Sequence, residues 1–468
     1  LYSLGYTSEE MGEIISNLDW SKYMSNNSSR EGTSFAEKEL ESKYVVNIPF
    51  DFSQKPDEVH AGRSFLQTLP SGVINGANLT NLFNSLSVGY QDSVDFNNFP
   101  IPFACVATDL VTGDPFIIRS GKFSTAIRAS MAIPIVFDPV KIGDRIYVDG
   151  GLVKNFPVDV CKEMGADIVI GVSLAPGLED NSEALNALPA QLKQLKEIIT
   201  DKNASNYDKE CDILIRPDLM GVGMLSFDSK SISKIIGSGY DCAKKMEEQF
   251  IQVKEKLEGY GPLKQQYNGE KAQNLSNQEF TVGNIEIEGV SEDEKLWLIK
   301  KSRIKRGTLI DINKLDKAMS IIYGVGAFKS ITYSVQPDDS VQNTYTVQIV
   351  PERLAPHNLN IGFRFDSQES AAIGLNFGVN NNKIRGFKGS FTSRLSYNPS
   401  VSATASYMTA LLPAVNLSYK FKKSDLDLSD GHSAEINSKY YRHNIQLYLS
   451  EFYSRYLTSG VGVENDIF

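Results

Sequence analysis

The sequence predicts a multi-domain protein: an α/β layered domain, then a small α+β module of order β-α-α-β-β, then an antiparallel transmembrane β-barrel that is incomplete in this chain. Three observations carry that prediction. Helical and apolar strand-like stretches alternate over residues 1–260, five short elements follow in residues 280–353, and a strict two-residue alternation fills residues 354–468. A length of 468 residues also exceeds that of one ordinary domain.

The composition narrows the classes of function. The chain has 57 acidic residues against 47 Lys and Arg, a net charge of −10, which argues against a nucleic-acid-binding protein. No apolar run reaches the roughly 18 residues of a transmembrane helix, which excludes a helical membrane protein but leaves a β-barrel open. The cysteines are interpreted as buried apolar thiols, and neither they nor the histidines have metal-ligand spacing, so we expect no metal and no organic cofactor. They are Cys105, Cys161, Cys211, Cys242, His60, His357, His432 and His443.

The first domain is expected to span residues 1–260. Thr7, with Glu10 three residues later, has the spacing of a capping box, so a helix should begin there. Residues 102–108 form a nearly continuous apolar run, which is typical of a strand buried on both faces. Further elements are predicted as strands over Arg145–Val148 and Ala166–Val172, a helix over Pro157–Met164, and a long helix from Ile232 to about Leu257.

A polar stretch rich in chain-breaking residues, residues 261–279, predicts a linker. In the module that follows, residues 280–353, the alternation of Val282–Val290 predicts a strand, and Ser291 is suited to cap the next helix. Gly307 separates this helix from the next. The remaining predicted elements are a second helix with Ile312, Leu315, Met319 and Ile322 on one face, and strands over Ser330–Val335 and Thr344–Val350.

Residues 354–468 alternate between an apolar face and a face of Gly, Ser, Asn, Lys and Arg, as transmembrane barrels do. A soluble β-sandwich alternates in the same way with its apolar face inward, so the alternation by itself leaves both open; the module upstream favours the barrel. About seven strands fit in this span and single-chain barrels need eight or more, so we expect the chain to continue past Phe468. In the barrel interpretation Phe363, Phe377, Leu417 and Leu447 point outward, and Asn360, Arg364, Asn376, Lys420 and Gln446 point inward.

Three spaced motifs lie within residues 103–174. They are Val-Ala-Thr-Asp109, Ala-Ile-Arg-Ala-Ser-Met-Ala-Ile-Pro134, and Asp149-Gly-Gly151 followed by Asn155-Phe-Pro157. Together they resemble the bacterial patatin-like phospholipase family, and the resemblance covers nearly all of residues 1–260. In that family a serine on a G-x-S-x-G turn works with the aspartate of a D-G-G motif as a dyad without histidine. The resemblance therefore implies a lipid acyl hydrolase.

The resemblance gives the catalytic role to Asp149. A carboxylate beside a serine hydroxyl can take its proton and later return it, so Asp149 would be the general base and then the general acid. Gly150 and Gly151 support the motif by letting the backbone turn tightly. In the family the oxyanion loop and the serine precede the residues that match Leu1–Thr7, so we expect the nucleophile upstream of residue 1. Arg128 is interpreted as a helix-surface residue or a member of a structural ion pair, in preference to a group that positions an anionic lipid headgroup.

The downstream parts resemble a POTRA module and an Omp85/BamA-type outer-membrane barrel, and the whole resembles patatin-barrel fusions of Gram-negative bacteria. This implies a location in the outer membrane, with the patatin domain periplasmic or surface-exposed. The expected substrate is a phospholipid or other acyl-ester lipid, cleaved as a phospholipase A does, and the expected partners are outer-membrane lipids. An outer-membrane protein complex or a homodimer is left open.

One alternative belongs to another class of function. The chain would be an outer-membrane assembly or translocation factor whose patatin domain is a non-catalytic binding module. POTRA edges bind client strands by β-augmentation, which gives this alternative a physical basis.

Overall fold

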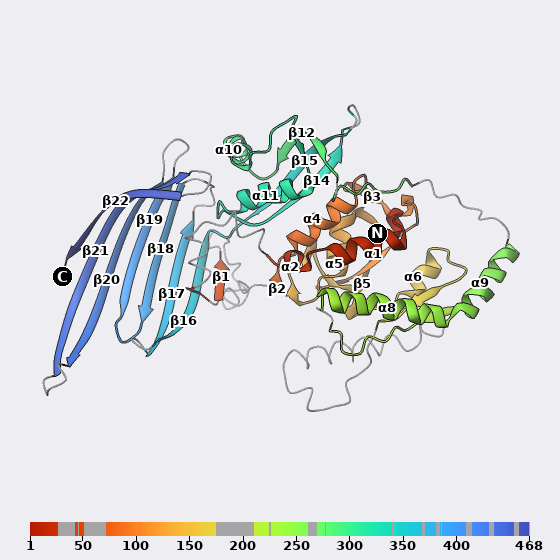
Figure 1. The fold of residues 1–468 in the computed structure, drawn as a ribbon, viewed down its shortest axis with the longest axis horizontal. Coiled ribbons are helices and arrows are strands. Elements are labelled where there is room, and N and C mark those ends of the chain that lie inside the picture. The colour runs from red at the N-terminus through yellow and green to blue at the C-terminus, as the bar shows by residue number, and fades with distance from the viewer. Residues whose placement is uncertain are drawn as a thin grey trace.

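The computed structural model describes residues 1–26, 43–44, 46–50, 72–174, 210–223, 226–260, 269–276 and 278–467, apart from gaps at 339–340, 342, 367–369, 381–383, 385, 409–413, 430–434 and 454–457. It has three parts (Figure 1). We call them the N-terminal unit (the described residues of 1–260), the βααββ module (280–353) and the C-terminal sheet (β1 and β16–β22). The multi-domain fold class predicted from the sequence is confirmed.

The N-terminal unit contains a four-stranded sheet of order β5-β4-β9-β8. Its two inner strands, β4 (Cys105–Asp109) and β9 (Arg145–Asp149), run antiparallel, between β5 (Pro115–Ile118) and β8 (Val140–Ile142). All five residues of β4 are buried, as its apolar sequence predicts. Helix α5 (Phe123–Ser130) packs on β4 and β9 and carries Phe123 into a buried aromatic cluster.

Shorter elements complete the N-terminal unit. Helix α1 (Ser8–Asn17) begins with the predicted capping box, because Thr7 Oγ1 accepts from the backbone N–H of Glu10 and the Glu10 carboxylate accepts from that of Thr7. The other elements are η1 (Tyr2–Leu4), α2 (Trp20–Tyr23), β2 (Gly72–Ile74), α4 (Ala77–Leu86), β3 (Ser93–Asp95), η3 (Phe96–Asn98), β6 (Ser120–Lys122), β7 (Ile135–Phe137), η4 (Gly150–Leu152), α6 (Val158–Glu163), β10 (Ile170–Val172), β11 (Ile213–Ile215), α8 (Ser229–Lys245) and α9 (Glu247–Tyr260).

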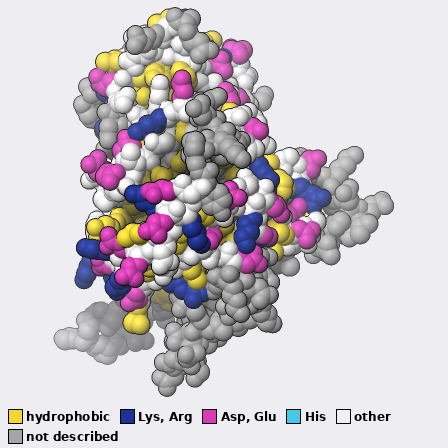
Figure 2. Space-filling model, turned by 90° about the vertical axis from the view of Figure 1, so that its right-hand side faces the viewer, with side chains coloured by type: hydrophobic (Ala, Val, Ile, Leu, Met, Phe, Trp, Pro, Cys, Tyr) yellow, Lys and Arg dark blue, Asp and Glu magenta, His cyan; other side chains and the backbone are white. Residues whose placement is uncertain are grey.

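Two details differ from the sequence prediction. The long helix expected from Ile232 is divided into α8 and α9, because the N–H of Met246 bonds to the carbonyls of Ala243 and Lys244 and so leaves the α-helical pattern. Among the cysteines expected to be buried, Cys105 is buried and burial raises its pKa to about 12, whereas Cys161 is exposed. Figure 2 views the molecule from the N-terminal unit's end and shows acidic and basic side chains interspersed over that surface.

The βααββ module has the predicted order of elements and one additional short strand. These are β12 (Phe280–Ile287), α10 (Glu292–Ser302), β13 (Leu309–Ile310), α11 (Ile312–Tyr323), β14 (Phe328–Pro337) and β15 (Thr344–Arg353). Strands lie in the order β13-β12-β15-β14, with β12 parallel to β15 and β14 antiparallel to it. Ser291 and Glu294 form a capping box at the start of α10. The apolar sides of the sheet and of α11 form one core, which includes Leu315 and Val347.

Part of the expected linker is packed against its neighbours. Ala272 is buried in the core of the N-terminal unit, and its N–H donates to the carbonyl of Leu4 at 3.0 Å. Leu275 is buried in the core of the βααββ module, and its N–H donates to the carbonyl of Ser85 at 3.1 Å. Residues 269–276 therefore join the two parts through buried contacts, although their composition predicts a free connection.

The C-terminal sheet has eight strands in the order β1-β16-β17-β18-β19-β20-β21-β22. Strands β16 to β22 are the seven expected after residue 354, and each pairs antiparallel with the next. They are His357–Asp366, Ser370–Asn380, Gly386–Leu395, Ser400–Met408, Ala414–Ser429, Glu435–Tyr453 and Thr458–Ile467. No helix in the described parts of the chain is both long and apolar enough to cross a membrane.

The first strand of the C-terminal sheet comes from an unexpected place. β1 (Val46–Phe50), which precedes most of the N-terminal unit, pairs antiparallel with β16, with Asn47 opposite Asn360. On the even-numbered face, Gly362 lies opposite Gly374, and a Cβ at Gly362 would come within 2.2 Å of the Lys43 carbonyl. Gly362 thus leaves the room that the backbone just before β1 occupies.

The two faces of the C-terminal sheet differ in the predicted way. The paired residues of β16–β22 have the same parity, except after the register shift in β21, where Phe452 lies opposite Ser459 and Tyr453 opposite Thr458. Outside that shift, odd-numbered side chains therefore share one face. The odd face is apolar and exposed, as at Leu417 (52 % exposed), and the even face buries amides such as Asn416 (9 % exposed). Asn376 lies on the even face as expected but is buried, not in open contact with solvent: it accepts from Asn360 at 2.9 Å and donates to Thr392 at 2.8 Å.

Candidate active site

Asp149 is the last residue of β9, and the short helix η4 follows it directly. Antiparallel pairing with β4 places it opposite Ala107, in the middle of the N-terminal sheet. A residue at the end of a buried strand has a fixed backbone but a side chain that leaves the sheet, so it is well placed to present a carboxylate.

Backbone contacts hold Asp149 from three sides. Its N–H donates to the Ala132 carbonyl at 2.9 Å, and its carbonyl accepts from the Thr108 hydroxyl at 2.9 Å. Its carboxylate Oδ1 accepts from the N–H of Gly151 at 2.7 Å. The last contact orients the carboxylate, which suits a group that must accept and return a proton.

The glycines of the motif are needed for a reason other than the one expected. Neither Gly150 nor Gly151 has a positive φ, so a tight turn does not require them. A Cβ at Gly150 would lie 2.1 Å from the Val106 carbonyl oxygen, and one at Gly151 would lie 2.7 Å from Asn155 Oδ1. The backbone of β4 therefore leaves no room for a side chain at Gly150, and a side chain at Gly151 would require the Asn155 side chain to move.

The loop that accepts the Asp149 N–H contains a strained residue that the sequence did not reveal. Ile135 has φ +73°, which is unusual for a β-branched residue, and it is 58 % exposed. Its neighbours fix this conformation: the Phe137 N–H donates to the Ile133 carbonyl at 2.9 Å, and Ile135 pairs with Gly72 of β2. Such strain often lies at functional sites.

An ion pair follows the motif on its C-terminal side. Lys154, whose N–H donates to the Gly150 carbonyl at 2.9 Å, forms a salt bridge with Asp159 of α6. Burial of Asp159 opposes its charged form, but the hydrogen bond from Lys154 and the N–H of Val160 outweigh burial and lower its pKa. The pair fixes the chain between η4 and α6, and so the far side of the motif.

Asp109 and Arg128, the charged residues of the other two motifs, have structural roles here. Asp109 accepts from the N–H groups of Val111 and Thr112 and from Arg145 at 2.8 Å, so it closes the turn after β4. Arg128 is 3 % exposed, and its Nη2 donates to the carbonyls of Asn75 and Asp138. Burial lowers the Arg128 pKa to about 10, with the Asp138 charge acting in the opposite direction. The guanidinium is buried and bound to backbone carbonyls, so Arg128 has a structural role but does not lie on the helix surface.

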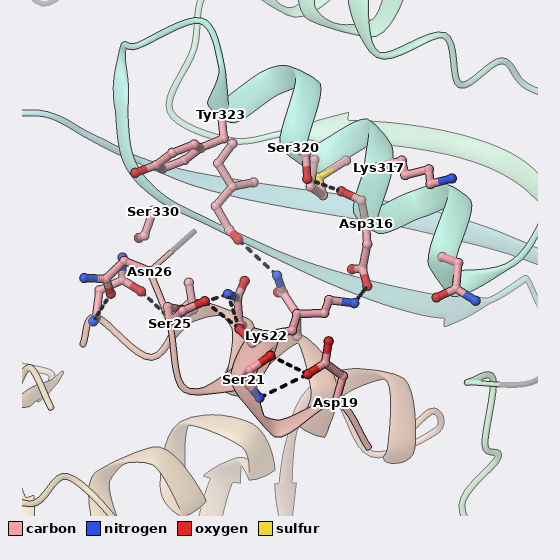
Figure 3. Close-up of a pocket in the computed structure, with 17 residues that line it drawn as sticks. Asp19, Ser21, Lys22, Ser25, Asn26, Asp316, Lys317, Ser320, Tyr323 and Ser330 are labelled. Atoms are coloured by element: carbon pink, nitrogen blue, oxygen red, sulfur yellow. Dashed lines mark hydrogen bonds and ion pairs between the residues drawn. The ribbon is translucent and has the colours of Figure 1, made fainter. Parts of the chain in front are cut away.

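A cavity of about 420 Å³ lies away from Asp149, between α2 and α4 of the N-terminal unit and α11 and β14 of the βααββ module (Figure 3). Most of its lining residues are Asp, Ser, Lys or Asn, and they include neither the D-G-G motif nor Ile135. The sequence did not predict this cavity, since its residues come from four separate elements.

Comparison with known proteins locates the family in the first third of the chain. Residues 1–162, which include Asp149, match the family model described as patatin-like phospholipase. An uncharacterised NTE family protein of Mycobacterium tuberculosis is 27% identical over 215 residues, which cover 39% of this chain and 36% of that protein. A second NTE family protein of the same species is 40% identical over 81 residues, or 17% of this chain and 22% of that protein. The chain thus spans about a third or less of these relatives.

Among solved structures, BamA from Haemophilus ducreyi lacking POTRA domains 1–3 is similar over 40% of this chain and 36% of that one, at 15% identity and a TM-score of 0.27. The family match coincides with the residues that build the site around Asp149. The N-terminal part of this chain therefore carries a patatin-like phospholipase domain.

Proposed function

We propose that this protein is a lipid acyl hydrolase of a Gram-negative outer membrane, with Asp149 as the base of a Ser-Asp dyad. The observation that carries the proposal is the Asp149 carboxylate, oriented by the Gly151 N–H at 2.7 Å within the residues that match the patatin-like family. The nucleophilic serine is expected upstream of Leu1.

The reaction follows ordinary acyl transfer. Asp149 takes the serine proton as the hydroxyl oxygen attacks the ester carbonyl, and returns it to the leaving alcohol or lysophospholipid. A water then attacks the acyl-serine and gives one proton to Asp149. Asp149 returns that proton to the serine oxygen as its bond to the acyl carbon breaks, which releases the fatty acid and restores the free serine hydroxyl and the Asp149 carboxylate. Backbone N–H groups of the expected upstream loop would stabilise the oxyanion.

The test is Asp149→Asn in the full-length protein. The amide still accepts the Gly151 N–H through its oxygen, so the fold should be retained, but it cannot take the serine proton. Hydrolysis of a short-chain ester should fall at least about a hundredfold. The matched control is Asp144→Asn, the same change at an exposed position five residues earlier, and it should keep full activity. Near wild-type turnover by a folded Asp149→Asn variant would remove Asp149 from the mechanism.

The βααββ module and the C-terminal sheet are assigned from their order of elements and from the exposure of their side chains. We propose that the βααββ module is a POTRA module, on the basis of its order of elements, and that β16–β22 belong to an outer-membrane barrel. The support for a membrane location is the apolar odd face: side chains such as Phe363, Phe391 and Leu447 are about half exposed, and a patch of this extent is unfavourable in water. Lipid contact would remove that cost.

A further inference from the structure

The N-terminal unit meets the βααββ module at the open edge of its sheet. β14 is an edge strand, with β15 on one side only, and α4 packs along the other side. An unpaired strand edge presents N–H and C=O groups that would bind another strand. Whether another strand can pair with β14 therefore depends on which side chains of α4 contact those N–H and C=O groups.

Side-chain amides occupy the edge of β14 at successive odd-numbered residues. Asn81 donates to the Ile331 carbonyl at 3.1 Å and accepts from the Tyr333 N–H at 2.8 Å. Asn84 donates to the Tyr333 carbonyl at 2.6 Å. Beyond the helix, Gln91 accepts from the Val335 N–H at 2.8 Å. The three amides reproduce the alternating donors and acceptors that a neighbouring strand would supply.

These contacts are buried and mutually consistent. Asn81, Asn84 and Gln91 are each 5–6 % exposed, and the Gln91 amide also donates to the Asn84 carbonyl. A buried amide is costly unless its hydrogen bonds are made, and so is a buried strand edge. Here the side-chain amides and the backbone groups of β14 form each other's hydrogen bonds. Their burial is therefore favourable only while the N-terminal unit and the βααββ module stay in contact.

Charged pairs flank the row of amides. Lys22 bonds to Asp316 of α11 at 2.5 Å across the cavity, and Asp316 also accepts from the Tyr333 hydroxyl at 2.7 Å (Figure 3). Partial burial opposes the charge on Lys22, but Asp316 outweighs it and raises the Lys22 pKa. At the far end of the loop after α4, Asp92 accepts from Gln336 at 2.8 Å.

We propose that Asn81, Asn84 and Gln91 form a built-in substitute strand that reserves the β14 edge for this chain's own N-terminal unit. The βααββ module then binds the hydrolase domain through the β14 edge and holds it in place, and client strands do not bind at this edge. This goes beyond the hydrolase activity, and it withdraws the β14 edge, one of the two edges of the sheet, from the alternative in which the module binds client strands.

The first test is hydrogen exchange in the full-length protein. Asn81→Ala, Asn84→Ala and Gln91→Ala together remove the amide acceptors of the Tyr333 and Val335 N–H groups. Exchange in the peptide Phe328–Pro337 should become about tenfold faster or more, since each lost hydrogen bond is worth about 1 kcal/mol and 1.4 kcal/mol is tenfold. The matched control is Asn78→Ala on the same helix, because Asn78 bonds only to the Lys22 and Ser25 carbonyls of its own unit; exchange there should be unchanged.

The second test asks whether the edge becomes available. A fluorescent peptide with the sequence of β15, residues 344–353, should bind the triple variant and not the wild type or Asn78→Ala. Should the triple variant fail to fold, Asn84→Asp alone replaces the donor to the Tyr333 carbonyl by a carboxylate oxygen and should show faster exchange and peptide binding. Binding of the peptide to the wild type as strongly as to a variant, or unchanged exchange in a folded variant, would overturn the proposal.

Discussion

The βααββ module and the C-terminal sheet use the same alternating pattern and bury opposite faces. In β15 the apolar residues Val347 and Ile349 are inside, and the polar residues between them point outward. In β20 the apolar residues Val415 and Leu417 are exposed, and Asn416 between them is buried. Alternation therefore determines that a segment is a strand and which residues share a face, but it does not determine which face is covered.

What covers each face explains the difference. Helices α10 and α11 contribute Leu298 and Leu315 to the core beneath the module's sheet, so its apolar face is dry. In the C-terminal sheet the even face covers itself, because Asn360, Asn376 and Thr392 hydrogen-bond across three neighbouring strands. Polar groups that hydrogen-bond to one another can be buried at little cost in free energy. The apolar face is then the one left exposed, and contact with lipid, as we propose, would be more favourable for it than contact with water.

The largest effect is expected from a charge in the module's core. Val347→Arg places an unpaired cation at a fully buried position, which should destabilise the module by at least about 4 kcal/mol and leave it protease-sensitive. Gln348→Arg, one residue on and on the other face, should be tolerated. If the two variants are equally sensitive to protease, the apolar face of the module's sheet is not buried, and the contrast with the C-terminal sheet fails.

An intermediate effect is expected on the exposed apolar face. Leu417→Arg puts a cation where we propose lipid, and should cost about 2–4 kcal/mol of unfolding free energy in outer-membrane vesicles. The matched control is Ser418→Arg, the next residue along β20 and on the even face. Ser418 is partly exposed, unlike the buried Asn416, so an arginine there can keep its charge in water and should cost little. If Ser418→Arg proves the more damaging, the sheet buries the opposite face and is a soluble one.

The smallest effect is expected within the row of amides on the even face. Asn376→Ala removes a donor to Thr392 and an acceptor for Asn360, so it should lower the unfolding free energy by about 1–3 kcal/mol. Thr404→Ala on the same face loses one exposed hydroxyl contact, with Ser390, and serves as the comparison. If Asn376→Ala is no less stable than Thr404→Ala, the Asn376 amide is solvated by water and its hydrogen bonds do not stabilise the even face.

The sequence was sufficient where local rules decide. Capping residues, the order of elements in the module and the seven strands after residue 354 follow from patterns a few residues long. Asp149 could be singled out because its motif is compact. The contacts of Asn81, Asn84 and Gln91 could not be predicted, since a polar helix face looks the same whether it meets solvent or a strand edge. The strain at Ile135 likewise depends on β2, more than sixty residues earlier.

The pairing of β1 with β16 has a consequence for the order of folding. Strands β16 to β22 join neighbours through short connections, so each can pair soon after its partner. β1 instead closes a loop of about 310 residues, and loops of that length close late and at higher entropic cost. Residues 46–50 are therefore synthesised about 310 residues before the strand with which they pair, β16. Until β1 pairs with β16, the edge of β16 is free to pair with another strand.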